Sequence, residues 1–117
     1  LNGDDLRSLQ HLVRRMPVGD KVIDAILELV RSARPGEGTS EEINTHISWG
    51  PGPRASQALM LAVRARALME GRYAPSIDDV IALAAPILRH RMALNFAARA
   101  DGITLAGVID RLTQRIS

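Results

Sequence analysis

The stretch Trp49-Gly50-Pro51-Gly52-Pro53-Arg54-Ala55-Ser56 alternates two glycines with two prolines and leads into a long segment rich in Ala and Leu. Glycine has no Cβ and lets another group approach its backbone closely, while proline stiffens a turn. Pro53 suits the first position of a helix, where no amide hydrogen is needed. The stretch therefore predicts a tight turn into a helix, with Arg54 in the first helical turn.

Arg54 occupies an unusual position for a cation, because the start of a helix already carries positive partial charge. Free amides, the helix dipole and a guanidinium at one point form a receptor for an anion, above all a phosphate. The alternative is that Arg54 pairs with a nearby acid, Glu41 or Glu42. The residues alone leave both interpretations open.

The composition indicates a helical protein. The 117 residues suit one compact domain with a modest core, and Ala and Leu are abundant while β-branched runs are few. The absence of cysteine excludes disulfides and thiolate metal sites. No apolar run is long enough to span a membrane and no signal-peptide pattern opens the sequence, so we expect a cytoplasmic protein. Because the sequence begins at Leu1 and not at methionine, we also expect a piece of a longer protein.

The charges do not favour a nucleic-acid partner. The sequence has 15 basic and 13 acidic residues, and Lys21 is the only lysine. The two signs are interspersed, whereas a nucleic-acid binder more often shows a basic block or stripe. Trp49, Tyr73 and Phe96 are the only aromatic residues, which is too few for a platform that stacks bases.

Helical periodicity and helix-stop signals predict an all-α fold, a small bundle of about five helices. The expected helices cover residues 4–16, 20–33, 53–70, 77–91 and 104–116. Ser76 and Asp79 have the spacing of a capping box at the start of the fourth helix, and Pro86 should bend or restart that helix.

Between these helices we expect less regular structure. Residues 34–52 are rich in Gly, Ser, Thr and Glu and are predicted to form one long loop. Two very short strands are expected, near residues 47–49 and 73–75. A short additional helical piece is expected over residues 96–100.

Catalytic and metal-binding patterns are missing from the sequence. It has no Gly-x-x-x-x-Gly-Lys-Ser/Thr loop for a nucleoside triphosphate. His11, His46 and His90 do not fall at metal-ligand spacings, so no metal site is expected. Asp78 and Asp79 are adjacent on a helix and do not face each other. Taken alone, the sequence indicates a helical module with one anion-seeking point and no catalytic machinery.

Several segments resemble the C-terminal lid of MoxR-type AAA+ ATPases. They are Trp-Gly-Pro-Gly-Pro-Arg-Ala-Ser-Gln-Ala-Leu at 49–59, Ala-Leu-Met-Glu-Gly-Arg at 67–72, Ile-Asp-Asp-Val at 77–80, Ala-Pro-Ile-Leu-Arg-His-Arg at 85–91 and Asn-Phe-Ala-Ala at 95–98. Their order and spacing match over most of the chain, and the first two expected helices fit the start of the lid with generic residues.

The resemblance implies that an N-terminal α/β core, absent from this sequence, precedes the lid and carries the phosphate loop and the magnesium-binding acids. In this family the arginine at the start of the third lid helix is the sensor-2 residue, a role that would fall to Arg54. Gln57 lies three positions later on the same face and is a further candidate to touch the nucleotide. The resemblance thus implies ATP and Mg²⁺ in the full-length protein and no cofactor or catalysis in the fragment alone.

The segment Arg89-His90-Arg91 has two interpretations that we hold equal. Its cations are favourable at a helix end, or, as the resemblance implies, Arg89 and Arg91 face a neighbouring subunit. The resemblance also implies a homo-hexameric, chaperone-like ATPase that matures partner proteins, with a von Willebrand factor A domain protein or a metalloenzyme as partner. The alternative function is a stand-alone helical binding module for DNA or an acidic protein, which only the richness in arginine supports.

Overall fold

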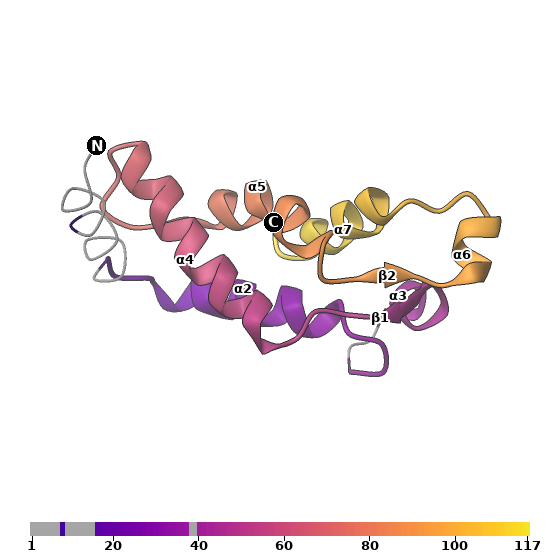
Figure 1. Cartoon of the computed structure of the whole chain (residues 1–117). Coiled ribbons are helices and arrows are strands. Elements are labelled where there is room, and N and C mark those ends of the chain that lie inside the picture. The colour runs from indigo at the N-terminus through magenta and orange to yellow at the C-terminus, as the bar shows by residue number, and fades with distance from the viewer. Residues whose placement is uncertain (1–7, 9–15, 38–39) are drawn as a thin grey trace.

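The computed structural model of the chain describes residues 8, 16–37 and 40–117, and they are mainly helical (Figure 1). The elements are α2 (Asp20–Ser32), α3 (Glu41–His46), β1 (Ile47–Trp49), α4 (Pro53–Met69), α5 (Ile77–Leu88), β2 (Ala93–Leu94), α6 (Phe96–Ala100) and α7 (Leu105–Gln114). The predicted all-α class is confirmed. The helix expected over residues 4–16 lies almost entirely outside the described residues.

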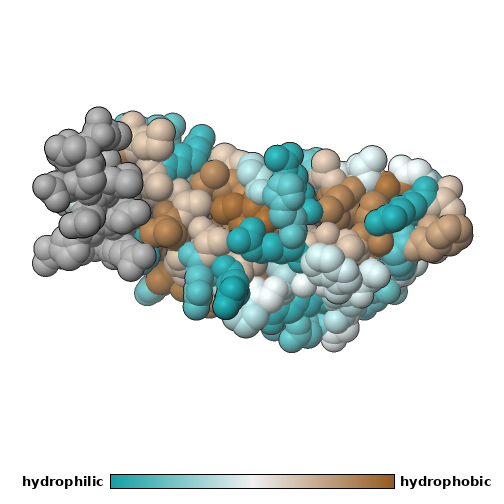
Figure 2. All heavy atoms as spheres, in the orientation of Figure 1, coloured by the Kyte–Doolittle hydropathy of each residue, from teal (hydrophilic) through white to brown (hydrophobic). Residues whose placement is uncertain are grey.

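Helix α4 is the central element, and it packs against both α2 and α5 (Figure 1). Ala55, Leu59, Val63 and Ala67 are completely buried and recur every four residues, so they form one face of the helix. Two of these four side chains are alanine methyl groups, which let neighbouring helices approach closely. Hydrophilic and hydrophobic residues are interspersed over the face shown in Figure 2, and neither kind forms one large block there.

The prediction of one long loop over residues 34–52 is wrong, because the helix α3 lies within this segment. Ser40 caps this helix, its Oγ accepting a hydrogen bond from the amide of Ile43 at 3.3 Å. Glu41 and Glu42 occupy the first turn, where acids are favoured, and Ile43 is buried in the core. The sequence analysis did not predict this six-residue helix because the residues on both sides of it have a composition typical of loops.

The strand predicted near residues 47–49 is confirmed, but the strand predicted near 73–75 is wrong. β1 pairs in antiparallel fashion with β2, and Trp49 lies opposite Ala93. Residues 73–75 form no strand; Tyr73 is exposed, and Pro75 has no amide to donate to a ladder. The partner of β1 therefore comes from a segment that the sequence analysis had placed next to a helix.

The helix expected over residues 77–91 ends earlier, at Leu88. Pro86 lies inside its last turn and does not restart it. Arg89 is the C-cap residue and still has helical backbone angles. Residues 89–92, which include Arg89, His90 and Arg91, form the turn that connects α5 to β2. The helical piece at 96–100 is present as α6, and Thr104 caps α7 by accepting a hydrogen bond from the amide of Gly107.

Gly50 is the point at which the approach to α4 crosses the end of α2. A Cβ on Gly50 would lie 2.5 Å from the carbonyl oxygen of Ala33 and 2.9 Å from Cα of Arg34. One residue later, Nε of Arg34 donates a hydrogen bond of 2.7 Å to the carbonyl oxygen of Pro51. By contrast, no atom of the described residues lies within 4 Å of the position that a Cβ on Gly52 would take. Of the two glycines at which a close approach was expected, Gly50 is therefore the one that shows it in the described part of the chain.

Asp79 joins the end of α4 to the start of α5. Its carboxylate is buried and accepts two hydrogen bonds from Arg72, at 2.5 and 2.8 Å, and one from Arg66 at 2.5 Å. It also accepts the amide hydrogen of Ser76 at 2.7 Å, as the predicted capping box requires. The bonds from Arg72 hold the pKa of Asp79 well below its usual range, with Ser76 and Arg66 acting in the same direction and burial opposing them.

Replacement of Gly50 by alanine is expected to lower the free energy of unfolding by about 2 kcal/mol, because the added methyl group must push the Ala33–Arg34 backbone away. Gly52→Ala is the matched control and is expected to cost less, at most about 1 kcal/mol, because alanine is a poorer N-cap residue than glycine but meets no close neighbour in the described residues. Urea unfolding at neutral pH measures both variants. Equal stabilities of the two variants would contradict the crossing at Gly50.

The low pKa of Asp79 predicts that the chain loses stability in acid. The carboxyl group ionises near pH 4 in the unfolded chain and at lower pH in the folded chain. Its contribution is therefore fully present above about pH 5 and is lost as the pH falls through 4 toward the folded pKa. We expect Asp79→Asn to cost about 2 kcal/mol at pH 7 and less at about pH 2, because the folded carboxyl group loses its charge only as the pH approaches its lowered pKa.

Urea unfolding of the wild type and of Asp79→Asn at both pH values tests this dependence. Asp78→Asn is the matched control, because Asp78 lies in the same helical turn and is exposed. Its effect is expected to stay below about 0.5 kcal/mol at either pH. A pH-independent cost of Asp79→Asn would show that its ionisation is not the source of the stabilisation.

Candidate functional site

Arg54 lies in the first turn of α4, as predicted. Pro53 is the first helical residue, and Gly52 at the N-cap provides no side chain to bond the free amides of the first turn. Arg54 is exposed and makes no hydrogen bond or ion pair within the described part of the chain. Pro53 has no amide hydrogen, and the amide of Ala55 donates a hydrogen bond of 3.0 Å to the carbonyl oxygen of Gly52. The guanidinium and the backbone amide of Arg54 are therefore the groups available at this place.

The acids proposed as alternative partners of Arg54 are not paired with it. Glu42 accepts two hydrogen bonds from Nε of Arg111, at 2.8 and 2.9 Å, and a third from its Nη2. This pairing raises the pKa of the Arg111 guanidinium above its ordinary value. Glu41 is exposed in the first turn of α3. Of the two sequence-based interpretations of Arg54, the anion receptor is the one compatible with this arrangement.

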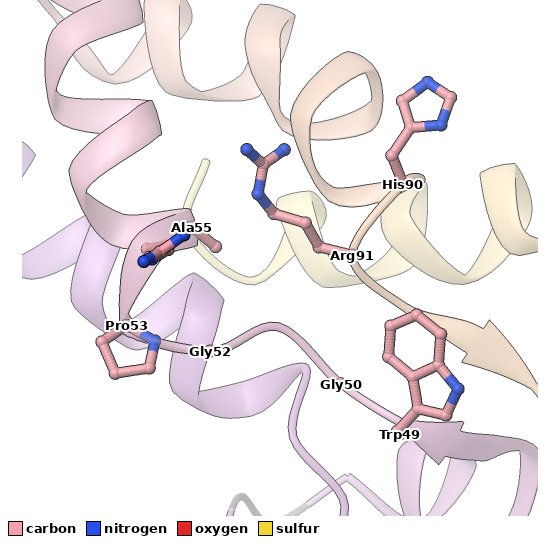
Figure 3. Close-up of a pocket in the computed structure, with 8 residues that line it drawn as sticks. Trp49, Gly50, Gly52, Pro53, Ala55, His90 and Arg91 are labelled. Atoms are coloured by element: carbon pink, nitrogen blue, oxygen red, sulfur yellow. The ribbon is translucent and has the colours of Figure 1, made fainter.

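A shallow surface depression of about 470 Å³, which we call the Arg54 hollow, surrounds this point (Figure 3). It is lined by Trp49, Gly50, Gly52, Pro53, Arg54, Ala55, His90 and Arg91. The lining contains two guanidinium groups and an imidazole but no carboxylate. Its chemistry therefore fits an anion, and phosphate oxygens are matched by the planar fork of arginine.

The pairing of β1 with β2 brings His90 and Arg91 to the hollow. Because the strands are antiparallel and Trp49 lies opposite Ala93, the residues just before β2 lie beside the residues just after β1. Nη1 of Arg91 donates a hydrogen bond of 2.9 Å to the carbonyl oxygen of Ile87 in the last turn of α5. In Figure 3 the guanidinium of Arg91 points toward α4, while the ring of His90 points away from it.

The other two predicted site residues lie outside the lining of the hollow. Gln57 is exposed one turn after Arg54. Arg89 is exposed, and its Nε lies 3.3 Å from Nε2 of His90. The structure thus separates Arg91 from Arg89 and places Arg91 with Arg54, a grouping that the sequence analysis missed. Recognition that residues near 93 form the strand partner of residues 47–49 would have predicted that Arg91 lies near Arg54.

Metal binding and membrane insertion find no support in the described ranges. Within residues 8, 16–37 and 40–117, no group of three or more His, Asp or Glu side chains is placed to hold a metal ion. No helix in the same part of the chain is long and apolar enough to cross a bilayer.

Comparison with known proteins gives consistent matches. Residues 40–112 match the family described as AAA lid domain. The whole chain is 31% identical to the chaperone MoxR1 of Mycobacterium tuberculosis and covers 31% of it. It is 29% identical to the uncharacterized protein YeaC of Bacillus subtilis over 97% of the chain, which is 33% of that protein.

A solved structure also matches. A candidate ATPase from Cytophaga hutchinsonii superposes with a TM-score of 0.90 and 26% identity, over 97% of this chain and 35% of that protein. The chain therefore spans about a third of the length of the proteins that it resembles.

The different contacts of Arg34 and Arg54 predict different effects on folding. Arg34→Gln removes the bond to the Pro51 carbonyl and is expected to lower the free energy of unfolding by about 1–2 kcal/mol. Arg54→Gln removes no contact within the described residues. It does remove a positive charge from the start of a helix, where a cation is unfavourable. The free energy of unfolding should therefore change by less than about 0.5 kcal/mol. Thermal and urea unfolding measure both, and a large loss in Arg54→Gln would reveal a folding role.

Proposed function

The chain belongs to the AAA lid domain family, and on that premise we propose that Arg54 is the sensor-2 arginine of a MoxR-type AAA+ ATPase. The observation that carries this proposal is the state of Arg54: an exposed guanidinium without a partner in the described chain, at the uncapped start of α4. It lies in a hollow that has no carboxylate in its lining. The similarity to a protein named as a MoxR chaperone adds support.

The mechanism that we propose is electrostatic. A core domain outside this chain holds ATP and Mg²⁺, and that bound nucleotide supplies the phosphoryl group and the metal charge. Phosphoryl transfer depends mainly on positioning and charge stabilisation. Arg54 binds an oxygen of the terminal phosphate, the dipole of α4 adds positive potential, and the stiff turn of Pro51 and Pro53 holds the helix start in place. Gln57, on the same exposed side, is a candidate for a second polar contact.

Closure of the lid over the core is then the step that depends on the nucleotide. With ATP bound, the terminal phosphate attracts Arg54 and favours closure; after hydrolysis and phosphate release this attraction is lost. Such motions commonly gate turnover. The proposal accordingly couples the position of α4 to the chemical state of the nucleotide.

For the longer protein we propose a cytoplasmic homo-hexamer that uses ATP hydrolysis to mature other proteins. A von Willebrand factor A domain protein and a metalloenzyme client are the partners that this family suggests. Arg89 is exposed at the end of α5 and is a candidate contact with the neighbouring subunit. The printed name of the Mycobacterium tuberculosis relative, a chaperone, is the support for the chaperone-like role.

Arg54→Ala in the protein that joins this lid to its ATPase core is expected to lower kcat for ATP by about 100-fold, because a charge that stabilises the transition state is lost. Phosphate release measures the rate. Arg99→Ala is the matched control, since Arg99 is an exposed arginine on α6 outside the hollow, and it should retain wild-type turnover. Wild-type turnover in Arg54→Ala would refute the sensor-2 assignment.

A further inference from the structure

We propose that Arg91 is a second phosphate-binding arginine of the same site, so that Arg54 and Arg91 together clamp the terminal phosphate of ATP. The inference rests on the proposed function of Arg54 and extends it to a residue on a different element. The two residues lie 37 positions apart in sequence, and both line the Arg54 hollow.

Strand pairing holds the backbone near Arg91 close to the start of α4. Trp49, the last residue of β1, pairs with Ala93, the first residue of β2, and the register is irregular between Ile47 and Trp49. Arg91 precedes Ala93 by two residues, and it lines the same hollow as Trp49 and Arg54.

Arg91 is half-buried, and its bond to the Ile87 carbonyl engages Nη1. A guanidinium has five N–H donors, so several of them stay available after that bond. The contact with the last turn of α5 holds the side chain, which points toward α4 (Figure 3). An arginine already held in place loses little rotamer freedom when it binds a ligand.

A second pair of arginines in the described residues, Arg66 and Arg72, provides a comparison. Arg66 and Arg72 also come together, and the buried carboxylate of Asp79 lies between them and accepts hydrogen bonds from both. Arg54 and Arg91 share a hollow in which no carboxylate provides that compensation. An anion from outside the chain would complete this site as Asp79 completes the other.

The chemistry of the anion follows from the donors. Two guanidinium groups and the first-turn amide of Arg54 suit a ligand with several oxygens and more than one negative charge, which describes a terminal phosphate. A single carboxylate would leave most of these donors unused. Because the sensor-2 role directs Arg54 to the terminal phosphate, Arg91 should discriminate ATP from ADP.

The test measures nucleotide affinity in the protein that joins this lid to its core, by calorimetric titration with ADP and with a non-hydrolysable ATP analogue. Arg91→Gln is expected to weaken binding of the ATP analogue about tenfold and of ADP less than about threefold. Arg99→Gln, which removes the same charge outside the hollow, should leave both affinities within about twofold. Arg54→Gln is measured alongside, and mass photometry follows assembly.

The outcomes separate this inference from the proposed function. If Arg54→Gln weakens ATP binding and Arg91→Gln has the same affinities as Arg99→Gln, the proposed role of Arg91 is wrong and the sensor-2 role of Arg54 stands. If neither arginine matters, both proposals fail. If Arg91→Gln loses affinity only together with assembled mass, Arg91 acts at a subunit boundary and the inference is overturned.

Arg91→Lys serves as a second variant in case Arg91→Gln unfolds more readily after losing the bond to Ile87. Lysine keeps the charge but lacks the planar fork that engages two phosphate oxygens. We expect a loss of about threefold in affinity for the ATP analogue, with the melting temperature of the nucleotide-free protein unchanged. Full wild-type affinity in Arg91→Lys would overturn the clamp.

Discussion

The close approach of Gly50 to the carbonyl of Ala33 is the constraint on which the rest of the structure depends. It presses the segment between β1 and α4 against the end of α2, at a separation that a side chain would not permit. The bond from Arg34 to the Pro51 carbonyl holds the same crossing from the other side. With its start held there, α4 lays its fully buried face of small and apolar residues against its neighbours.

The crossing at Gly50 also determines which charged side chains come together on the surface. Because the path from Trp49 to Pro53 is fixed, the ribbon formed by β1 and β2 delivers the end of α5 to the start of α4. Arg66 and Arg72 are neutralised by Asp79, and these contacts tie α4 to α5. A second pair in the described residues, Arg54 and Arg91, faces a hollow without an acid in its lining. The first pair stabilises the fold, and the second is the part of the surface that we assign to the nucleotide.

Membership in the AAA lid domain family explains why such a site looks incomplete. The chain covers about a third of its relatives. In the function that we propose, the nucleotide is held by another domain, and this chain contributes cations to it. The sensor-2 role and the second arginine remain proposals that variants at Arg54 and Arg91 can separate.

By itself, the sequence determined the all-α class and the helices around 20–33, 53–70 and 104–116. It also determined that Arg54 lies in the first turn of α4. These features follow from periodicity, helix caps and proline positions, which act over a few neighbouring residues. It did not determine α3, whose six residues are too short for a periodic signal. Only the tertiary structure decided the partner of β1, the early end of α5 and the meeting of Arg91 with Arg54. Strand pairing across more than 40 residues depends on how the whole chain packs, and the spacing of neighbouring residues in the sequence does not predict it.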